Sequence, residues 1–560
     1  MIKKIYQSFD SKIKNKLKIF FILTVIFVLI EVFLIGSLYP IFQNFFSEQS
    51  QNNSFLNSFF NTHKLSQKSL LISVGILVIL RFFYFLFFNF YKNKFLQELQ
   101  KTAAEKLFYN FFINKSFESF ISYNSSTLIR DLVNETQTFK KFVNVAISLF
   151  VEILLILFIS MFLIILNLKI FFTVITFLLL IGLIYFVILK SQLNSLGSDR
   201  IITVKNIIKN ITESFKFFEI IRIHNKLSYF YETNSNNYKK LNNILIKINI
   251  FQVLPRVIVE TIFFLVVLIL MFSISKSSNM SIEFSLLTIF FVVFLRIYPS
   301  FVKIINSIQD LNLFKKSVEG IYNQIFPKNS KDEITENSKE ILELKNSIRI
   351  DNFTFQYKSK YIFKNFDFNI GKNSFNAIVG RSGSGKSTLI KTLLGLLKPE
   401  NVNVFFDEKQ TDFKKLNTFF RAKVGYAGQN NLVLNSPLFE NITLDKNDIN
   451  FSAHTKSKLK NAFIDSGLNE FFEFEHDLNK IIDEDGKNVS GGQMQRISLA
   501  RALFFSNGIL ILDEICSSLD LESEKKIIKI LKKLSSEYMI LYITHRDNFF
   551  DEFDQVIKIN

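Results

Sequence analysis

The stretch Val489-Ser490-Gly491-Gly492-Gln493 decides how the C-terminal part of this chain folds, because of the two elements that flank it. Before it comes the loop Gly380-Arg381-Ser382-Gly383-Ser384-Gly385-Lys386-Ser387-Thr388, and after it an apolar run that ends in Asp513-Glu514. The loop follows the apolar run Phe375–Val379 and precedes a stretch of helical spacing, so its backbone N–H groups are expected to converge on phosphate oxygens. The run before Asp513 predicts a buried parallel strand, which delivers acids to the edge where α/β sheets bind ligands. The sequence therefore predicts an α/β nucleotide-binding domain.

Lys386 and Ser387 carry the chemistry that is expected of the glycine-rich loop. The ammonium of Lys386 is expected to contact the β- and γ-phosphates of a nucleotide, and the hydroxyl of Ser387 to bind Mg²⁺. The loop as a whole, Gly380 to Thr388, is therefore predicted to bind ATP with Mg²⁺.

The order of these three elements, within about one domain's length, resembles the ATP-binding-cassette (ABC) ATPases. In that family the Ser-Gly-Gly-Gln loop of one subunit closes over the nucleotide held by another. The resemblance thus implies a homodimer in which Ser490, Gly491, Gly492 and Gln493 contact the nucleotide of a second copy. One cassette is present, so the chain is expected to form one half of a dimeric assembly.

The resemblance also assigns roles to residues around the phosphates. Glu514 matches the general base that polarises the attacking water, and Asp513 matches the residue that holds Mg²⁺. His545 matches the switch histidine that contacts the γ-phosphate. Gln429 matches the loop residue that senses the γ-phosphate and binds Mg²⁺. These assignments make Glu514, His545 and Gln429 the predicted catalytic residues.

Three further residues match positions at the edges of the site. Tyr357 matches the aromatic ring that stacks on adenine, and Asp520 matches the loop that crosses the dimer interface. Glu484 matches a cross-linking acid that is typical of exporters. The departures from the family pattern, Val489 for Leu and Gly428 for Pro among them, remove no chemical group from the mechanism.

The N-terminal part differs sharply, because six apolar segments there are long enough to cross about 30 Å of hydrocarbon. They run near 19–39, 70–91, 143–166, 168–189, 253–275 and 284–306. Long charged loops at 92–142 and 190–252 resemble the intracellular loops of ABC exporters, and their coupling turns are expected near Phe117–Tyr123 and Phe218–His224. The predicted fold is a six-helix all-α transmembrane domain of the exporter type (1–310), a linker (311–345) and a C-terminal α/β P-loop cassette (346–560).

Charge indicates how the chain lies in a membrane. Six Lys and one Asp precede the first span, so the positive-inside rule predicts that the N-terminus is cytoplasmic. An even number of spans returns the ATPase to the same side. The predicted location is a bacterial inner membrane. The net charge of +18 follows from lysines that flank the spans, and nucleic acid is not an expected partner. No cleavable signal peptide is predicted. The single cysteine, Cys516, excludes an intramolecular disulfide.

Charged residues inside the predicted spans require an explanation, because they are costly in hydrocarbon. They include Arg81, Arg256 and Arg296, with Glu31, Glu152 and Glu260. One alternative is internal Arg–Glu pairing, and the other is a cavity in which the arginines bind a phosphate. Their local patterns resemble the flippases of lipid-linked oligosaccharides, where an arginine belt meets a pyrophosphate. A short outer helix at 54–60 would meet the lipid tail, unless that segment is only a polar loop.

The leading hypothesis is an ATP-hydrolysing ABC exporter or flippase that moves a lipid-linked oligosaccharide or related anionic amphipathic lipid. Arg81, Arg256 and Arg296 are its candidate substrate-binding residues. The alternatives are a lipid, multidrug or peptide exporter and, from another class, an ATPase that gates a membrane partner without transport.

Overall fold

The computed structural model describes most of the chain, in two units. The described residues are 4, 6–7, 9–46, 67–114, 117–121, 125–166, 168–274, 280–326, 343–357, 360–446, 452–516, 521–546 and 549–559. The first unit comprises Met1–Lys115 and Ile121–Ile334, and the second comprises Ser116–Phe120 and Thr335–Asn560. Each unit has its own hydrophobic core.

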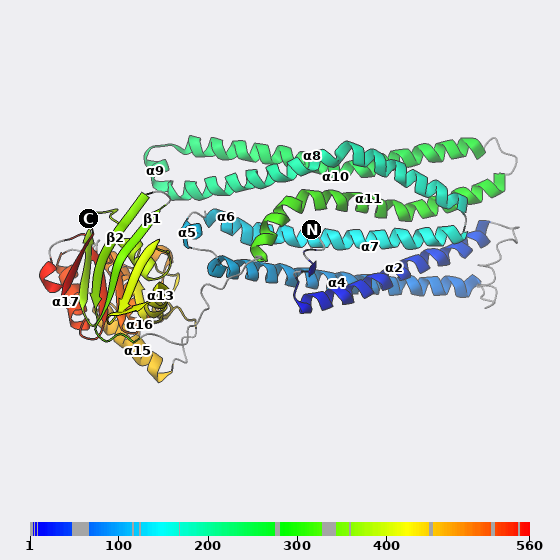
Figure 1. The fold of residues 1–560 in the computed structure, drawn as a ribbon. Helices are drawn as coiled ribbons and strands as arrows, with labels where there is room; N and C mark the ends of the chain where they lie inside the picture. The colour runs from blue at the N-terminus through cyan, green and yellow to red at the C-terminus, as the bar shows by residue number, and fades with distance from the viewer. Residues whose placement is uncertain are drawn as a thin grey trace. The chain divides into compact units, whose positions relative to one another are not determined.

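The first unit is built from long helices, and each predicted span falls within one of them, apart from residue 275, which lies outside the described residues (Figure 1). They are α2 (Ser11–Phe46), α4 (Gln67–Asn114), α7 (Thr136–Leu166), α8 (Leu168–Lys216), α10 (Leu227–Ile274) and α11 (Met280–Ile325). Four described segments are long and apolar enough to cross a membrane: Ser11–Leu34, Leu71–Ile113, Thr127–Ile165 and Leu227–Leu265. The predicted spans at 168–189 and 284–306 lie on helices where many side chains are outside the described residues. The count of six spans therefore stays a prediction.

These helices are longer than a bilayer requires. The 48 residues of α4 give a length of about 72 Å at 1.5 Å per residue, against about 30 Å of hydrocarbon. α2 packs against α4, α7 against α11, and α8 against α10 (Figure 1). The two long predicted loops are thus helical extensions of the spans, as expected.

Short helices stand where the chain turns back between the long ones. α5 (Phe117–Ile121), α6 (Ser125–Arg130) and the π-helix η1 (Asp131–Glu135) connect α4 to α7, and α9 (Phe218–Ile223) connects α8 to α10. Both predicted coupling turns therefore contain a short helix. The predicted outer helix at 54–60 lies outside the described residues.

The end of α11 shows where the helical domain stops. Val318, Ile321 and Ile325 are 0–3% exposed and belong to the core of the first unit, because their spacing places them on one face of a helix. Residues 311–325 are consequently the last turns of α11 instead of the first part of the predicted linker. Within the rest of that linker, residues 327–342 lie outside the described residues.

The second unit contains a parallel sheet that positions the site. Its strand order is β11 (Gln555–Ile559), β3 (Phe375–Gly380), β10 (Met539–Thr544), β9 (Ile509–Asp513) and β6 (Val424–Ala427). Every neighbouring pair in this sheet is parallel. All residues of β9 and β10 are buried, which agrees with their continuous apolar sequences.

Helices and an antiparallel sheet complete the second unit (Figure 1). The antiparallel sheet has the order β2 (Lys360–Gly371), β1 (Ser347–Tyr357), β4 (Asn401–Phe406) and β5 (Lys409–Thr411), and β7 (Ser436–Pro437) pairs with β8 (Ile481–Ile482). The helices are α12 (Lys386–Leu393), α13 (Phe413–Lys423), α14 (Leu438–Thr443), α15 (Ala453–Asp465), α16 (Gly491–Phe505) and α17 (Leu521–Leu534). The 3₁₀ turns are η2 (Leu468–Glu470), η3 (Glu484–Gly486) and η4 (Phe550–Glu552). A P-loop cassette fold is thus observed where the sequence predicted one.

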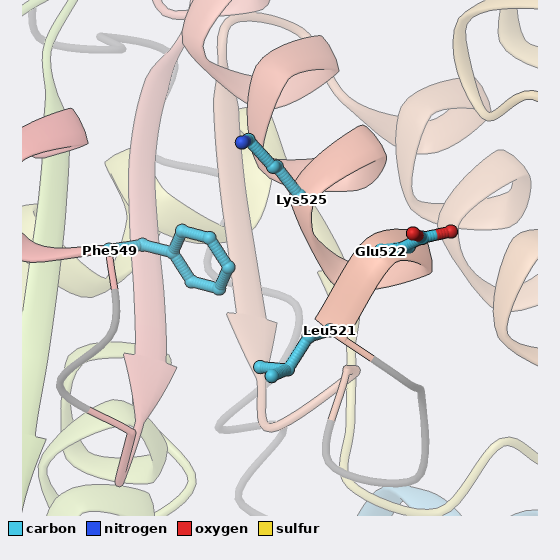
Figure 2. Close-up of a pocket in the computed structure, with 4 residues that line it drawn as sticks. All are labelled: Leu521, Glu522, Lys525 and Phe549. Carbon is cyan, nitrogen blue, oxygen red and sulfur yellow. The ribbon is translucent and has the colours of Figure 1, made fainter.

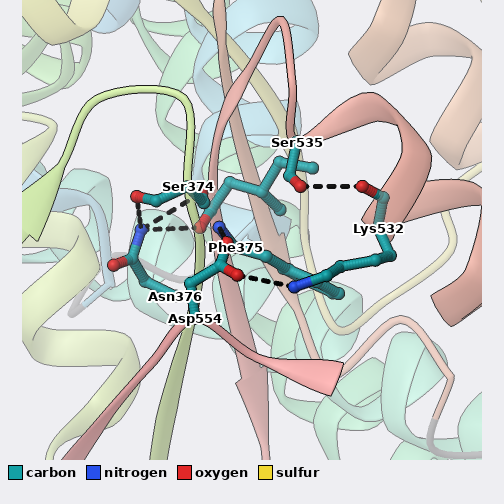
Figure 3. A network of polar contacts seen from close by, with 7 residues as sticks. Ser374, Phe375, Asn376, Lys532, Ser535 and Asp554 are labelled. Atoms are coloured by element: carbon teal, nitrogen blue, oxygen red, sulfur yellow. Dashed lines mark hydrogen bonds and ion pairs between the residues drawn. The ribbon is translucent and has the colours of Figure 1, made fainter. Parts of the chain in front are cut away.

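A polar network holds the last strand and α17 to β3 (Figure 3). The N–H of Phe375 donates to Asp554 Oδ2 at 2.8 Å, and Lys532 Nζ donates to Asp554 Oδ1 at 2.6 Å. Burial alone would raise the pKa of Asp554, but these two hydrogen bonds hold it below its ordinary value. Asp554 therefore acts as an ionised anchor for two separate segments.

Replacing Asp554 with Ala is expected to destabilise the cassette without affecting catalysis. The buried N–H of Phe375 would lose its acceptor, which costs about 1–3 kcal/mol and lowers the unfolding midpoint by roughly 2–4 °C per kcal/mol. Thermal unfolding of the purified protein at pH 7 measures this effect. The matched control Asp554→Asn keeps an acceptor for Phe375 and should lose less.

The same anchor predicts a pH dependence. Because the folded pKa of Asp554 is depressed, its contribution is fully present above the unfolded pKa of about 4 and is lost as pH falls through the folded pKa. An Asp554→Ala effect of equal size at pH 2.5 and pH 7, in variants that remain folded, would contradict this account.

Candidate nucleotide site

Four neighbouring parallel strands deliver the predicted catalytic groups to one edge of the sheet. Lys386 follows β3, His545 follows β10, Glu514 follows β9 and Gln429 follows β6. The register aligns the strand ends, since Val379 pairs with Thr544 and Ile543 pairs with Asp513. Side chains that are far apart in the sequence therefore meet at the carboxyl edge, where α/β sheets bind ligands.

The glycine-rich loop forms a cradle that only glycine permits at one position. Gly385 has φ 107°, and a Cβ there would lie 2.6 Å from Ile362 and 2.9 Å from Phe363. Ser384 Oγ is buried and has no hydrogen-bond partner among the described residues. An unpartnered buried hydroxyl in such a loop fits a phosphate, whose oxygens accept hydrogen bonds.

Lys386 is buried and points back into its own loop. Its Nζ donates to Gly380 O at 2.8 Å and to Arg381 O at 3.0 Å. These two carbonyl oxygens accept hydrogen bonds that a bound phosphate would accept in their place. The ammonium therefore already lies within the cradle. Gly380, Arg381, Ser382, Gly383, Ser387 and Thr388 complete the predicted phosphate-binding loop.

Asp513 and Ser387 together have the donor atoms of a ligand pair for Mg²⁺. Asp513 is 5% exposed, and burial raises the pKa of its carboxyl, while a hydrogen bond from Ser387 opposes that rise. Burial and then the charge of Asp513 raise the pKa of Tyr426 to about 12. A hydroxyl and a carboxylate are the hard oxygen ligands that Mg²⁺ prefers, so these residues would hold the ion, which would neutralise phosphate charge.

Glu514 lies in contact with both other predicted catalytic residues. Gln429 Nε2 donates to Glu514 Oε2 at 3.0 Å, and His545 Nδ1 lies 3.7 Å from Glu514 Oε1. Gln429's amide oxygen is then the atom left to bind a metal ion. The structure thus brings the three predicted catalytic side chains together.

The backbone of Glu514 is unusual and was not expected from the sequence. Its φ of 52° is left-handed, which costs a non-glycine residue about 1–2 kcal/mol. Its N–H donates to Ile543 O at 3.2 Å, in the strand that leads to His545. This bond fixes the carboxylate at the junction of β9 and β10.

The loop Ser490-Gly491-Gly492-Gln493 begins α16 with a capping box. Ser490 Oγ accepts from Gln493 N at 3.2 Å, and Gln493 Oε1 accepts from Ser490 N at 2.8 Å. The N–H groups of Gly491 and Gly492 lie in the first turn, where a helix leaves donors unpaired. An exposed helix N-terminus of this kind attracts anions.

The remaining predicted residues lie at the edges of the second unit. Tyr357 ends β1 with 39% of its surface exposed, so its ring is accessible for stacking. Glu484 is exposed in η3. Asp520 lies outside the described residues. Cys516 is buried behind β9, as expected of a small packed residue.

The packing partners of Phe117, in the predicted coupling turn, were not predicted from the sequence. The short segment Ser116–Phe120 belongs to the second unit, although its neighbours along the chain belong to the first. Phe117 packs against the core that includes Leu389 and Ile390, and Lys391 Nζ lies 5.5 Å from the centre of its ring.

A separate open cavity of ≈ 390 Å³ lies at the beginning of α17 (Figure 2). Leu521, Glu522, Lys525 and Phe549 line it. None of these residues belongs to the predicted nucleotide site, so the cavity is not its adenine or phosphate pocket.

Two of the three arginines in the predicted spans form internal ion pairs. Arg81 Nε lies 2.7 Å from Glu31 Oε1, and the Glu31 side chain is only 3% exposed. Arg256 Nε lies 2.9 Å from Glu260 Oε1. The pairing alternative is therefore observed for Arg81 and Arg256, and the side chain of Arg296 lies outside the described residues.

The partners of the other acids were missed by sequence reasoning. Tyr298 donates a second hydrogen bond to Glu260 at 2.6 Å, and Lys303 pairs with Glu152 at 2.9 Å. Lys303 falls inside the predicted span 284–306, so an intramembrane lysine was the signal that could have found it.

Comparisons with known proteins agree with this site and fold. Residues 363–517 match the family model described as ABC transporter. An ATP-dependent lipid A-core flippase 2 of Colwellia psychrerythraea is 34% identical over 227 residues, which cover 40% of this chain and 38% of that protein. An alpha-hemolysin translocation ATP-binding protein of Proteus vulgaris is 35% identical over 218 residues, covering 38% and 30%.

The chain thus spans less than two fifths of the length of these curated relatives. The solved structure of a bacterial Atm1-family ABC exporter with ATP bound superposes with a TM-score of 0.77 at 15% identity, covering 98% of this chain and 94% of that one. The glycine-rich loop, the Ser-Gly-Gly-Gln loop and the acidic strand end all fall within or beside residues 363–517. The chain therefore carries an ABC transporter ATP-binding domain, and as a whole it has the fold of an ABC exporter.

Proposed function

We propose that this chain is half of an ATP-driven exporter or flippase that works as a homodimer in a bacterial inner membrane. The observation that carries the proposal is the meeting of Lys386, Glu514 and His545 at one sheet edge, in a chain whose other unit consists of long apolar helices. Such an arrangement hydrolyses ATP and couples it to movement of the helices. The N-terminus and the cassette lie on the cytoplasmic side.

The proposed substrate is an anionic amphipathic lipid, such as a lipid-linked oligosaccharide. The name of the flippase relative supports a lipid, and the partly exposed guanidinium of Arg81 supports an anionic headgroup. Arg81 keeps 39% of its side chain exposed while it is paired with Glu31, so the guanidinium has donors left for a second acceptor. Arg256 is 67% exposed and has the same capacity.

The Arg81–Glu31 pair gives a direct experiment. Arg81→Leu removes the cation that pairs with the buried Glu31 carboxylate and should destabilise the protein by about 3–5 kcal/mol. Arg81→Leu with Glu31→Gln removes both charges and should restore folding and basal ATP turnover. If Arg81 also binds substrate, the double variant still loses lipid-stimulated turnover and ATP-dependent movement of a fluorescent anionic lipid across proteoliposomes.

One control makes that result decisive. Glu31→Gln alone keeps the arginine and should retain lipid stimulation. Full recovery of lipid stimulation in the double variant would assign Arg81 to pairing alone and would contradict the substrate role.

Protein export is a second candidate, favoured by the similarity to the hemolysin translocation protein. The same proteoliposomes distinguish it, because an exporter of polypeptides would show no ATP-dependent movement of lipid.

A further inference from the structure

A buried polar cluster lies directly behind the catalytic strand ends and has no role in the mechanism described above. It contains Glu524 on α17, with Tyr542 on β10, Arg546 and Cys516. The side chain of Glu524 is only 2% exposed, and Arg546 Nη1 donates to Glu524 Oε2 in a close ion pair. Tyr542 donates a longer bond to Glu524 Oε1, at 3.5 Å.

Only one of these groups balances the charge of Glu524. Burial raises the pKa of the Cys516 thiol to about 12 and raises that of Tyr542 well above its ordinary value, so both are neutral at pH 7. The guanidinium of Arg546 is therefore the counter-charge of a carboxylate that burial would otherwise make costly.

The cluster connects the segments that carry the catalytic residues. Arg546 directly follows His545, and its N–H donates to Thr544 Oγ1 at 3.0 Å, which fixes the turn after β10. Cys516 follows Glu514 by two residues at the end of β9. Glu524 lies in the first turn of α17, so its ion pair with Arg546 ties this helix to the residue beside His545.

We infer that Arg546 and Glu524 are positioning residues, whose ion pair holds His545 against Glu514. The inference rests on the proposed ATPase function. Neither residue has to touch the nucleotide. Their effect is to fix the 3.7 Å separation between His545 Nδ1 and Glu514 Oε1, which a rotation of the turn after Thr544 would change.

The geometry also explains why an arginine suits this position. A planar guanidinium presents donors in fixed directions, so it can hold Glu524 while its own backbone stays in the turn. A lysine keeps the charge but not the direction of the bonds. Arg546→Lys is therefore the variant that removes positioning while it leaves the buried carboxylate neutralised.

The test measures ATP turnover of the full-length protein in lipid nanodiscs against ATP concentration. A displacement of about 1 Å in a catalytic group can cost roughly 10²-fold in rate, so Arg546→Lys is expected to lower kcat by about tenfold or more. Its KM for ATP should change by less than about twofold, because ground-state binding is untouched.

Two further variants separate positioning from stability. In a His545→Ala background, Arg546→Lys should cause no additional loss, since a residue that acts through His545 has nothing left to position. Glu524→Gln combined with Arg546→Gln removes both charges and should fold, yet keep the lowered kcat. The control Lys532→Gln breaks another ion pair of α17 and should lower thermal stability with kcat unchanged.

An equal loss from Arg546→Lys with and without His545 would overturn the inference, and so would a raised KM with normal kcat. Failure of the proposed function would look different. In that case Glu514→Gln would retain turnover regardless of any change at Arg546.

Discussion

Glu514→Gln is expected to bind ATP normally and to lose nearly all hydrolysis. The substitution keeps the size of the side chain, and an amide oxygen can still accept from Gln429 Nε2. It removes the basic carboxylate, and the loss of a general base costs typically 10²–10⁴-fold in rate. The residues after position 514 are Ile515 and Cys516, so no neighbouring acid at the end of β9 can replace Glu514 as the base.

Two measurements on purified protein check this expectation. ATP turnover should fall by the factor above, while ATP with Mg²⁺ should still raise the thermal unfolding midpoint as in the wild type. In the related family the two cassettes separate after hydrolysis, so the variant should also accumulate a closed dimer.

The matched control is Glu522→Gln, the same exchange at an exposed acid in the first turn of α17. It should hydrolyse ATP at the wild-type rate. Substantial turnover in Glu514→Gln would remove Glu514 from its role as base, whatever the control shows.

The sequence predicted the cassette well because its signals are local. The glycine-rich loop after Phe375–Val379 and the acids after Ile509–Leu512 each combine a strand, a turn and a functional side chain within a few residues. Parallel strands place such turns at one edge, so the meeting of Glu514, His545 and Gln429 followed from topology. The helical character of the extensions beyond the predicted spans followed in the same way from hydrophobic periodicity.

The partners of charged residues could not be predicted, because they depend on contacts between distant segments. Three arginines and three glutamates suggested two schemes, and composition alone could not decide between them. In the structure Glu152 pairs with Lys303, more than a hundred positions away, and Tyr298 joins the pair of Glu260. The Arg546–Glu524 pair and the left-handed φ of Glu514 likewise arise from the way β9, β10 and α17 meet.

Mixing two inactive variants is expected to recover ATP hydrolysis if each nucleotide lies between two copies of the chain. Lys386→Ala damages the phosphate cradle, and Ser490→Arg places a bulky cation where α16 begins. Each homodimer then carries two singly damaged sites. A heterodimer carries one intact site and one doubly damaged site, because Lys386 and Ser490 of one site come from different chains.

Random association makes half of the dimers heterodimers, so turnover up to about a quarter of the wild-type value is expected for a symmetric two-site dimer. The two proteins should be mixed before reconstitution, with turnover measured per mole of protein. Since Ser490→Arg also removes the capping hydrogen bond to Gln493, worth about 1 kcal/mol, its unfolding midpoint must be shown to stay above the assay temperature.

The proposed trans arrangement would explain physically why a chain with one cassette works as a pair. Ser490 is exposed in the single chain, and its hydroxyl accepts its hydrogen bond within its own capping box, so the first turn of α16 keeps N–H donors for an anion held elsewhere. Full activity in either parental homodimer would show that Lys386 and Ser490 do not serve the same site. Absence of recovery in folded, verified heterodimers would place both residues of each site in one chain.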